Sequence, residues 1–364
     1  DRIMGFKDLK SWQKKRLWIS FLLVLIAAVV FLTATASSLY QDKFMEDEYW
    51  HETLTTPESV QQKIEAQSGN ETQVMVGSYV ENLKEISLKD SNFGMKVLVW
   101  FRWEGNDTLD MVNHFRIYKG TINSKEIVED YHKDGINYQS ALLDVTVSKN
   151  FWTNRFPLES HQLRMYLEAG PTVQDVVFVA DTQHSSMNPS LSISGYQLLR
   201  HEVGTFAMEY NNTFGNPTLK AAPINSEFVT AMEINRNSLG LYFKCFIALF
   251  GTTAWVLIML YISTYHRVDP LLMVPPILVG TVANIMIGAN LLPDALQFGL
   301  LEHVNIWGIM TILIVAIAII NINYIRNQKN DENFAKFYGR FMFWEILIIT
   351  VAGHVILPLA AYMM

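Results

Sequence analysis

Residues 267–294 read RVDPLLMVPPILVGTVANIMIGANLLPD, and this segment sets the interpretation of the whole chain. Its run 271–292 carries no charge and is long enough for a helix across a bilayer, which needs ~20 mostly apolar residues. The run also contains residues that suit lipid contact poorly: Pro275, Pro276, Gly280, Thr281, Asn284, Gly288 and Asn290. Such residues at membrane depth are typical of a helix that is surrounded by protein or lines a cavity. We therefore expect the inner helix of an assembly, which makes it a candidate pore wall.

Four further apolar blocks have a similar length, and half of the 364 residues are hydrophobic. The blocks are 17–40, 245–265, 304–325 and 341–364. Basic residues precede the first block and acidic residues follow it: Lys7, Lys10, Lys14, Lys15 and Arg16, then Asp42, Glu46, Asp47 and Glu48. By the positive-inside rule the N-terminus is cytoplasmic and the region after residue 40 is periplasmic or extracellular. The sequence thus predicts a multi-pass protein of a plasma or bacterial inner membrane.

The first block has two interpretations. Ala34-Thr35-Ala36-Ser37 near its end resembles the cleavage site of a signal peptide. The length of the block is more typical of a retained anchor, so we expect an N-terminal transmembrane helix.

Between the first two blocks, the period of the apolar residues changes to two. Met95, Val97, Val99, Phe101 and Trp103 occupy alternate positions, as in a half-buried strand. Further strand signals lie at 74–83, 114–118, 138–148, 161–168, 176–180, 196–209 and 227–235. Many short strands separated by Gly, Asn and Asp indicate an antiparallel β-sandwich. The only cysteine, Cys245, lies in a later apolar block, so this domain contains no disulfide.

These patterns divide the chain into four parts. Residues 1–40 form a cytoplasmic basic segment and the N-terminal transmembrane helix. Residues 41–71 form a linker with a short helix, for which Thr56-Pro57-Glu58 is a start signature. The extracytoplasmic β-sandwich is 72–238, and the four-helix transmembrane domain is 239–364.

Several function classes lack their signatures in this sequence. The net charge of -7 is not concentrated in a run that would bind nucleic acid, so we expect no nucleic-acid partner. The histidines have no metal-ligand spacing, and we expect neither a metal nor a cofactor. No nucleophile elbow, phosphate loop or pair of catalytic carboxylates occurs, so we predict that the protein is not an enzyme.

A set of motifs in order resembles the pentameric ligand-gated ion channels, prokaryotic type. VGSYVENL at 76–83 and VWFRW at 99–103 resemble their opening strands, and FWTNRFPLESHQL at 151–163 resembles their signature loop. Glu233-Ile-Asn-Arg236 resembles the strand end before the first channel helix, and Leu292-Pro293 resembles the close of the second. The resemblance covers residue 72 to the C-terminus. Glu159 replaces the aspartate of the family loop, flanking cysteines are absent, and the N-terminal anchor lies outside the family pattern.

The resemblance implies a homopentamer in which the helix 271–292 faces a central axis. The implied pore-lining residues are Leu272, Pro276, Val279, Ala283 and Met286. Their spacing of three and four places them on one helix face, which is entirely apolar. A second face, formed by Pro276, Gly280, Asn284 and Gly288, is small and polar and suits close helix packing. The sequence leaves open which of these two faces lines the axis.

Charges and prolines at the ends of this helix also have alternative roles. Asp269 and Asp294 would form acidic rings at the two mouths if repeated five times, whereas Asp269 could instead cap the helix start. Pro275-Pro276 predicts a kink or a break, either as a gate hinge or as an ordinary structural kink.

The resemblance also implies coupling and ligand residues. The coupling residues are Phe156, Pro157, Glu159, Arg236 and Pro293, with Glu159 and Arg236 paired either as a two-state switch or as a static ion pair. Tyr210 and Phe214, in the loop between the last two strands, are the candidate ligand-binding residues. The alternative for these two aromatic side chains is a surface hairpin that they stabilise themselves.

Taken together, the sequence predicts a subunit of a homopentameric, ligand-gated-channel-like membrane protein. We expect it to conduct cations under the control of an extracytoplasmic small-molecule or ion ligand, in contact with membrane lipids. The alternative is a non-conducting sensor or structural subunit that retains the channel fold, which the dry axial face and the tandem prolines favour.

Overall fold

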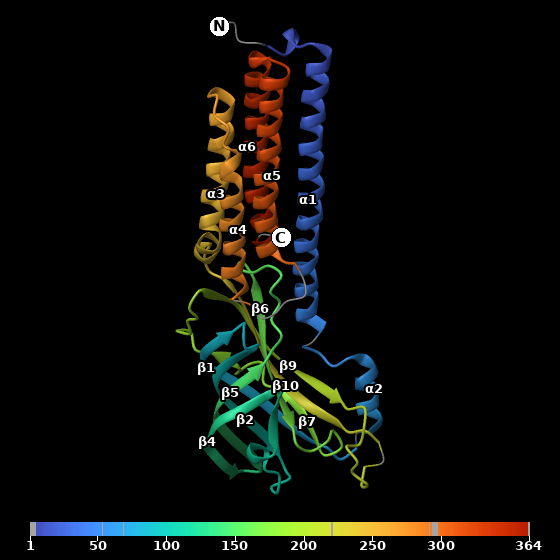
Figure 1. The fold of residues 1–364 in the computed structure, drawn as a ribbon. Helices are drawn as coiled ribbons and strands as arrows, with labels where there is room; N and C mark the ends of the chain where they lie inside the picture. The colour runs from blue at the N-terminus through green and yellow to red at the C-terminus, as the bar shows by residue number, and fades with distance from the viewer. Residues whose placement is uncertain are drawn as a thin grey trace. The chain divides into compact units, whose positions relative to one another are not determined.

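The structure, a computed structural model, describes residues 5–52, 54–67, 69–219, 221–290, 292 and 298–362. The chain divides into two compact units (Figure 1). The helical unit comprises Asp1–Phe44, Thr153–Glu159 and Leu239–Met364. The sandwich unit comprises Met45–Trp152 and Ser160–Ser238.

The strands of the sandwich unit form two sheets in the described part of the chain. One sheet has the order β4-β5-β2-β1-β7, with β8 paired to β1, and the other has the order β3-β6-β10-β9. The strands are β1 Thr72–Ser87, β2 Asn92–Glu104, β3 Phe115–Tyr118, β4 Gly120–Lys133, β5 Ile136–Ser148, β6 Ser160–Ala169, β7 Val176–Ala180, β8 Ser186–Met187, β9 Tyr196–Glu209 and β10 Ile224–Arg236. A sandwich-like pair of sheets is therefore confirmed. The pairings are antiparallel except for β1 with β7 and β1 with β8, which are parallel.

The core of this unit follows the period-two pattern of the sequence. In β2 the side chains of Met95, Val97, Val99 and Phe101 are fully buried, and the intervening ones are more exposed. β4 was not predicted, because after its first residues its side chains are exposed on both faces and produce no alternation. Its place is set by antiparallel pairing to β5 rather than by its own apolar residues.

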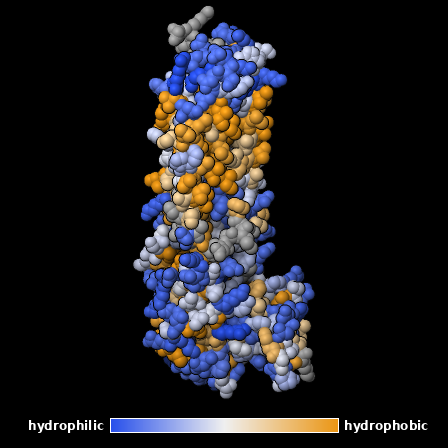
Figure 2. Space-filling view, viewed as in Figure 1, coloured by the Kyte–Doolittle hydropathy of each residue, from blue (hydrophilic) through white to orange (hydrophobic). Residues whose placement is uncertain are grey.

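The helical unit contains four helices that are long and apolar enough to cross a membrane. They are α1 Ser11–Glu52, α3 Gly240–Tyr265, α5 Leu300–Gln328 and α6 Glu332–Tyr362. Figure 2 shows apolar side chains over these helices and hydrophilic ones at the end where α1 begins. α1 continues past residue 40 to Glu52, so the predicted linker is helical in its first part; its residues from Met45 on belong to the sandwich unit. The short predicted helix is α2, Glu58–Gln67.

The fifth predicted spanning block, 271–292, differs from expectation. Its residues form a 3₁₀ turn, η3 (Leu271–Met273), followed by α4 (Val274–Ala289). With 16 residues, α4 is about 24 Å long, shorter than the ~30 Å hydrocarbon core. Among the described residues this block therefore does not supply a fifth helix of spanning length. One face of α4, with Val274 and Ile277, joins the apolar core built with α3, α5 and α6.

Candidate functional site

The five predicted lining residues share one exposed face of α4 and the preceding turn. Leu272 is 89% exposed, Val279 69% and Met286 65%, and Pro276 and Ala283 are exposed as well. On the opposite face Thr281 is fully buried with Val274 and Ile277. The neighbouring Met273 and Val282 are also exposed, so the exposed surface is broader than the predicted line. The pore-lining role of the five residues stays a prediction.

The tandem prolines lie in the first turn of α4, directly after η3. A proline costs little there because the first amides of a helix have no intrahelical partner. The expected break is thus a change from a 3₁₀ turn to an α-helix rather than a kink inside α4. Asp269 Oδ1 accepts a hydrogen bond from the Leu271 backbone N–H at 3.1 Å, so it bonds the first amide of η3, although the N-cap position itself is occupied by Pro270. Asp294 and Pro293 lie outside the described residues.

The small-residue face of α4 has no packing partner at Gly280 within the described chain. Gly280 is exposed, and a Cβ added there would meet no atom within 4 Å. Pro276 is exposed too. A packing seam at these two positions would require a second copy of the chain. The side chain of Asn284 and the surroundings of Gly288 lie outside the part of the chain that the structure describes.

The central part of the signature-like loop, residues 153–159, belongs to the helical unit, where α1, α5 and α6 hold it. Asn154 Nδ2 donates to Asp42 Oδ1 at 2.7 Å, and Arg155 Nε lies 3.3 Å from Asp42 Oδ2. The Leu300 backbone N–H donates to the Asn154 carbonyl at 2.6 Å, and Arg155 Nη1 donates to the Ala361 carbonyl at 3.4 Å. These contacts fix residues 153–159 among α1, α5 and α6, and the chain continues from residue 159 directly into the strand that begins at residue 160.

Of the predicted coupling residues, Phe156, Pro157 and Glu159 are buried in this loop. The Phe156–Pro157 peptide bond is cis. Arg236 ends β10 in the sandwich unit, and its guanidinium lies over the Tyr196 ring at 4.0 Å. The pairing of Glu159 with Arg236 stays a prediction.

No pattern in the sequence indicates that Asp42, Asn154 and Arg155 lie together. Asp42 and Arg155 are 113 residues apart, and their side chains are 11% and 3% exposed. Arg155 stands directly before the Phe-Pro motif, which is the one local signal that could have drawn attention to it. Asp42 is one of several acids after the first block and is not distinguished by its neighbours.

Tyr210 and Phe214 pack against each other at the tip of the β9–β10 hairpin. Their ring centroids are 5.1 Å apart in an edge-to-face arrangement, and Phe214 is 64% exposed. The Tyr210 hydroxyl donates to Glu168 Oε2 at 2.6 Å and also contacts the Arg116 guanidinium. Burial and the bonded Glu168 carboxylate raise the pKa of Tyr210 to about 12. The rings support the hairpin, and their ligand-binding role stays a prediction.

A buried acid lies near the loop end of this hairpin, where Glu227 pairs with Phe206. Glu227 on β10 is 1% exposed, and burial together with the nearby Glu168 carboxylate raises its pKa to about 8. Arg116 Nη2 lies 2.7 Å from Glu168 Oε1. Glu227 therefore holds a proton at neutral pH.

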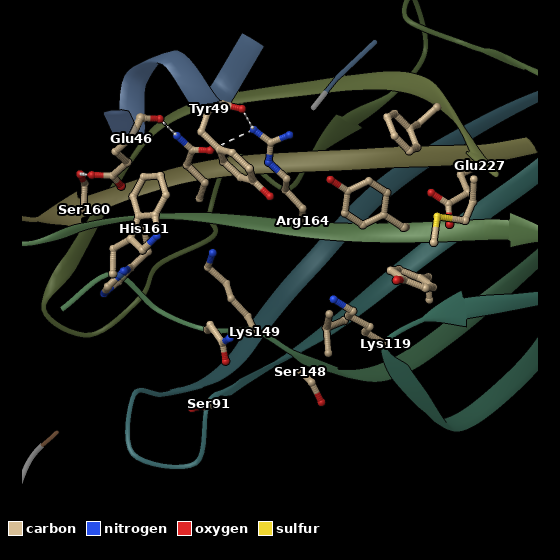
Figure 3. A pocket seen from close by; sticks show the side chains of 18 of the residues that line it. Glu46, Tyr49, Ser91, Lys119, Ser148, Lys149, Ser160, His161, Arg164 and Glu227 are labelled. Atoms are coloured by element: carbon tan, nitrogen blue, oxygen red, sulfur yellow. Dashed lines mark hydrogen bonds between the residues drawn. The ribbon is translucent and has the colours of Figure 1, made fainter. Parts of the chain in front are cut away.

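The sandwich unit contains a cavity of about 710 Å³, which Figure 3 shows from close by. Lys119 follows β3, Lys149 follows β5, and Arg164 lies on β6, so three cations from separate segments surround one space (Figure 3). Burial, and to a smaller extent the charge of Arg164, lowers the pKa of Lys149 to about 8. The acids of the lining are Glu46, Asp90 and Glu227. This arrangement suits a small polar ligand that carries an anionic group.

The last turns of α1 cover one side of this cavity. Glu46 Oε2 accepts from the Ser160 hydroxyl at 2.9 Å, and the Glu46 carbonyl accepts from Gln162 Nε2 at 2.5 Å. Arg164 Nη2 donates to the Trp50 carbonyl at 3.0 Å, and the Tyr49 ring lies 5.6 Å from the Trp152 ring. The cavity was not predicted because its lining comes from segments that are distant in sequence.

The comparisons with known proteins add no family to this geometry. No protein-family model matches the chain, and neither does any curated protein. Within the described residues, no group of three or more His, Cys, Asp or Glu side chains is arranged to hold a metal ion.

Proposed function

We propose that this protein is a multi-pass membrane subunit of a homopentameric, ligand-gated-channel-like assembly. In the proposal the exposed face of α4 surrounds the axis and conducts cations, and the sandwich unit receives an extracytoplasmic stimulus. The observation that carries it is the placement of the five predicted lining residues. All are exposed on one apolar face, while the opposite face of the same helix is buried in the helical core.

Two further features support a receptor rather than a simple pore. The sandwich unit offers a cavity of ligand size and an exposed aromatic hairpin. The loop 153–159 provides a buried connection from a sandwich strand into the helical unit. A stimulus that moves β6 therefore has a covalent and a polar route to α1, α5 and α6.

A non-conducting sensor is the second candidate, and Thr281 favours it. Thr281 is the hydroxyl-bearing residue of α4, yet it is fully buried and donates to the Ile277 carbonyl at 3.1 Å. The exposed line is left without a hydroxyl to replace water around an ion. A line that is apolar throughout its length can exclude water and remain closed.

Reconstitution tests the two candidates together. We would image purified particles and measure cation flux into liposomes for the natural chain and for Val279→Ser. A serine on the axial line makes a dewetted constriction easier to hydrate, so we expect resting flux to rise on the order of tenfold. Val282→Ser is the matched control, because Val282 is apolar and 52% exposed but off the predicted line.

The outcomes separate the candidates. Five-fold particles with flux that responds to Val279→Ser and not to Val282→Ser support a channel. Five-fold particles without flux in any of the three proteins support the sensor. Monomers or dimers would contradict both.

A further inference from the structure

A second cavity, of about 690 Å³, lies in the helical unit between α1 and the pair α5 and α6. Its apolar part is lined mainly by aliphatic residues of α1 and α5, among them Ile19, Leu23, Ala27 and Ile317. On α1 the lining runs from Trp12 to Ala27. We call this cavity the α1 groove.

One end of the α1 groove is cationic. Lys15, Arg16 and Lys329 line it, and its described lining residues include no aspartate or glutamate. The Arg16 guanidinium lies 4.4 Å from the Tyr324 ring centroid, and its Nη2 donates to Asn321 Oδ1 at 2.5 Å. Arg16 Nε is buried and has no hydrogen-bond partner among the described residues. The guanidinium of Arg16 is thus held in place, while its Nε–H makes no hydrogen bond among the described residues.

The dimensions of the groove match one leaflet of a bilayer. Lys15 and Ala27 are twelve positions apart on a continuous helix, which corresponds to about 18 Å. One half of a bilayer hydrocarbon core is ~15 Å thick. The groove therefore combines a cationic end with an apolar length that suits one acyl chain. On the proposed topology the cationic end lies on the cytoplasmic side, where anionic lipids are concentrated.

We propose that the α1 groove is a binding site for an anionic glycerophospholipid. The phosphate contacts Arg16, Lys15 and Lys329, and an acyl chain lies along Ile19, Leu23 and Ala27. The lipid fills the space between α1 and the other helices, so it joins the N-terminal helix to α5 and α6. This inference rests on the membrane part of the proposed function and does not depend on conduction.

Native mass spectrometry of the detergent-purified protein tests the headgroup. Phosphatidylglycerol and phosphatidylcholine with the same acyl chains are titrated in turn. We expect tighter retention of phosphatidylglycerol, and a loss on the order of tenfold in Lys15→Gln/Lys329→Gln, which breaks no hydrogen bond or ion pair among the described residues and removes only the contact of Lys329 with the Tyr324 ring. Lys14→Gln is the matched control, since Lys14 lies over the Phe6 ring at 5.7 Å and does not line the groove.

A second pair of variants tests the acyl chain. Ala27→Trp fills the groove and should displace the lipid, whereas Val30→Trp, at an exposed position of α1 outside the lining, should not. Equal retention of both lipids, an equal effect of Lys14→Gln, or full displacement by inorganic phosphate would overturn the inference alone. A protein that stays soluble without detergent and retains neither lipid would overturn the membrane assignment as well.

Discussion

The loop 153–159 precedes β6, and the β9–β10 hairpin belongs to the same sheet as β6. The two segments differ in the contacts that hold them in place. In the first, the side chains of Arg155 and Asp42 are nearly inaccessible to solvent, and Arg155 contacts the Asp42 carboxylate of α1 and the Ala361 carbonyl of α6. In the second, Asn212 and Asn216 accept hydrogen bonds from residues two positions away, and Phe214 is exposed. One loop is fixed by distant partners, and the other largely by its own residues.

The difference concerns what each loop can do. A charge buried in low dielectric is costly unless its partner is present, so the position of Arg155 depends strictly on α1 and α6. Local turn bonds at the surface cost little to rearrange. The first loop is therefore suited to transmit a displacement and the second to adapt to a ligand.

Arg155→Ala should destabilise the helical unit by about 3–5 kcal/mol, because it removes the cationic partner of the buried Asp42 carboxylate and leaves it only the neutral Asn154 amide. Thermal unfolding in detergent measures the effect. The double variant Arg155→Ala/Asp42→Ala should lose less than the sum of the two single variants. Lys63→Ala is the control: Lys63 pairs with Glu209 at 2.5 Å, but both side chains are substantially exposed, so we expect less than about 1 kcal/mol. Equal losses at the two pairs would remove the contrast between the loops.

Glu227→Gln should change how the free energy of unfolding depends on pH. The folded protein keeps Glu227 protonated up to a pKa of about 8, whereas the unfolded chain releases that proton near 4.5. The stabilising contribution of the proton is complete below pH 4.5 and is lost as pH rises toward 8. The natural protein should therefore lose melting temperature across this window, and Glu227→Gln should lose less. Parallel melting curves of the two proteins would contradict the assignment of a buried, protonated Glu227.

Phe214→Ala should change stability by no more than about 0.5 kcal/mol, since a mostly exposed side chain contributes little to the core. If the ring forms part of a ligand site, the flux response to the stimulus changes while the melting temperature does not. A melting temperature that falls as far as in Arg155→Ala would mean that the hairpin is a structural element like the first loop.

The sequence predicted the elements that have strong periodicity. The bounds of β7 and β9 agree with the strand signals at 176–180 and 196–209, and β2 agrees in type and in its buried positions. The apolar blocks identified α1, α3, α5 and α6, because hydropathy over about twenty residues is a local property. β4 was missed because its exposed side chains carry no period.

The site was less predictable than the fold. The hydrogen bond from the Leu271 amide to Asp269 is close to the capping role that the sequence offered for this residue, because such bonds involve neighbours in the chain, but Pro270 occupies the N-cap position. The sandwich cavity and the α1 groove were not predicted, since each collects side chains from segments far apart.

The sequence by itself determined most of the helices and strands, which of their faces are apolar, and which loop carries the Phe-Pro motif. Tertiary structure alone decided that Asp42 meets Arg155, that the tandem prolines begin α4 instead of bending it, and that Lys15, Arg16 and Lys329 converge on one groove. The physical reason is range: periodicity and capping act over a few residues, whereas buried charges and cavities depend on which distant segments pack together.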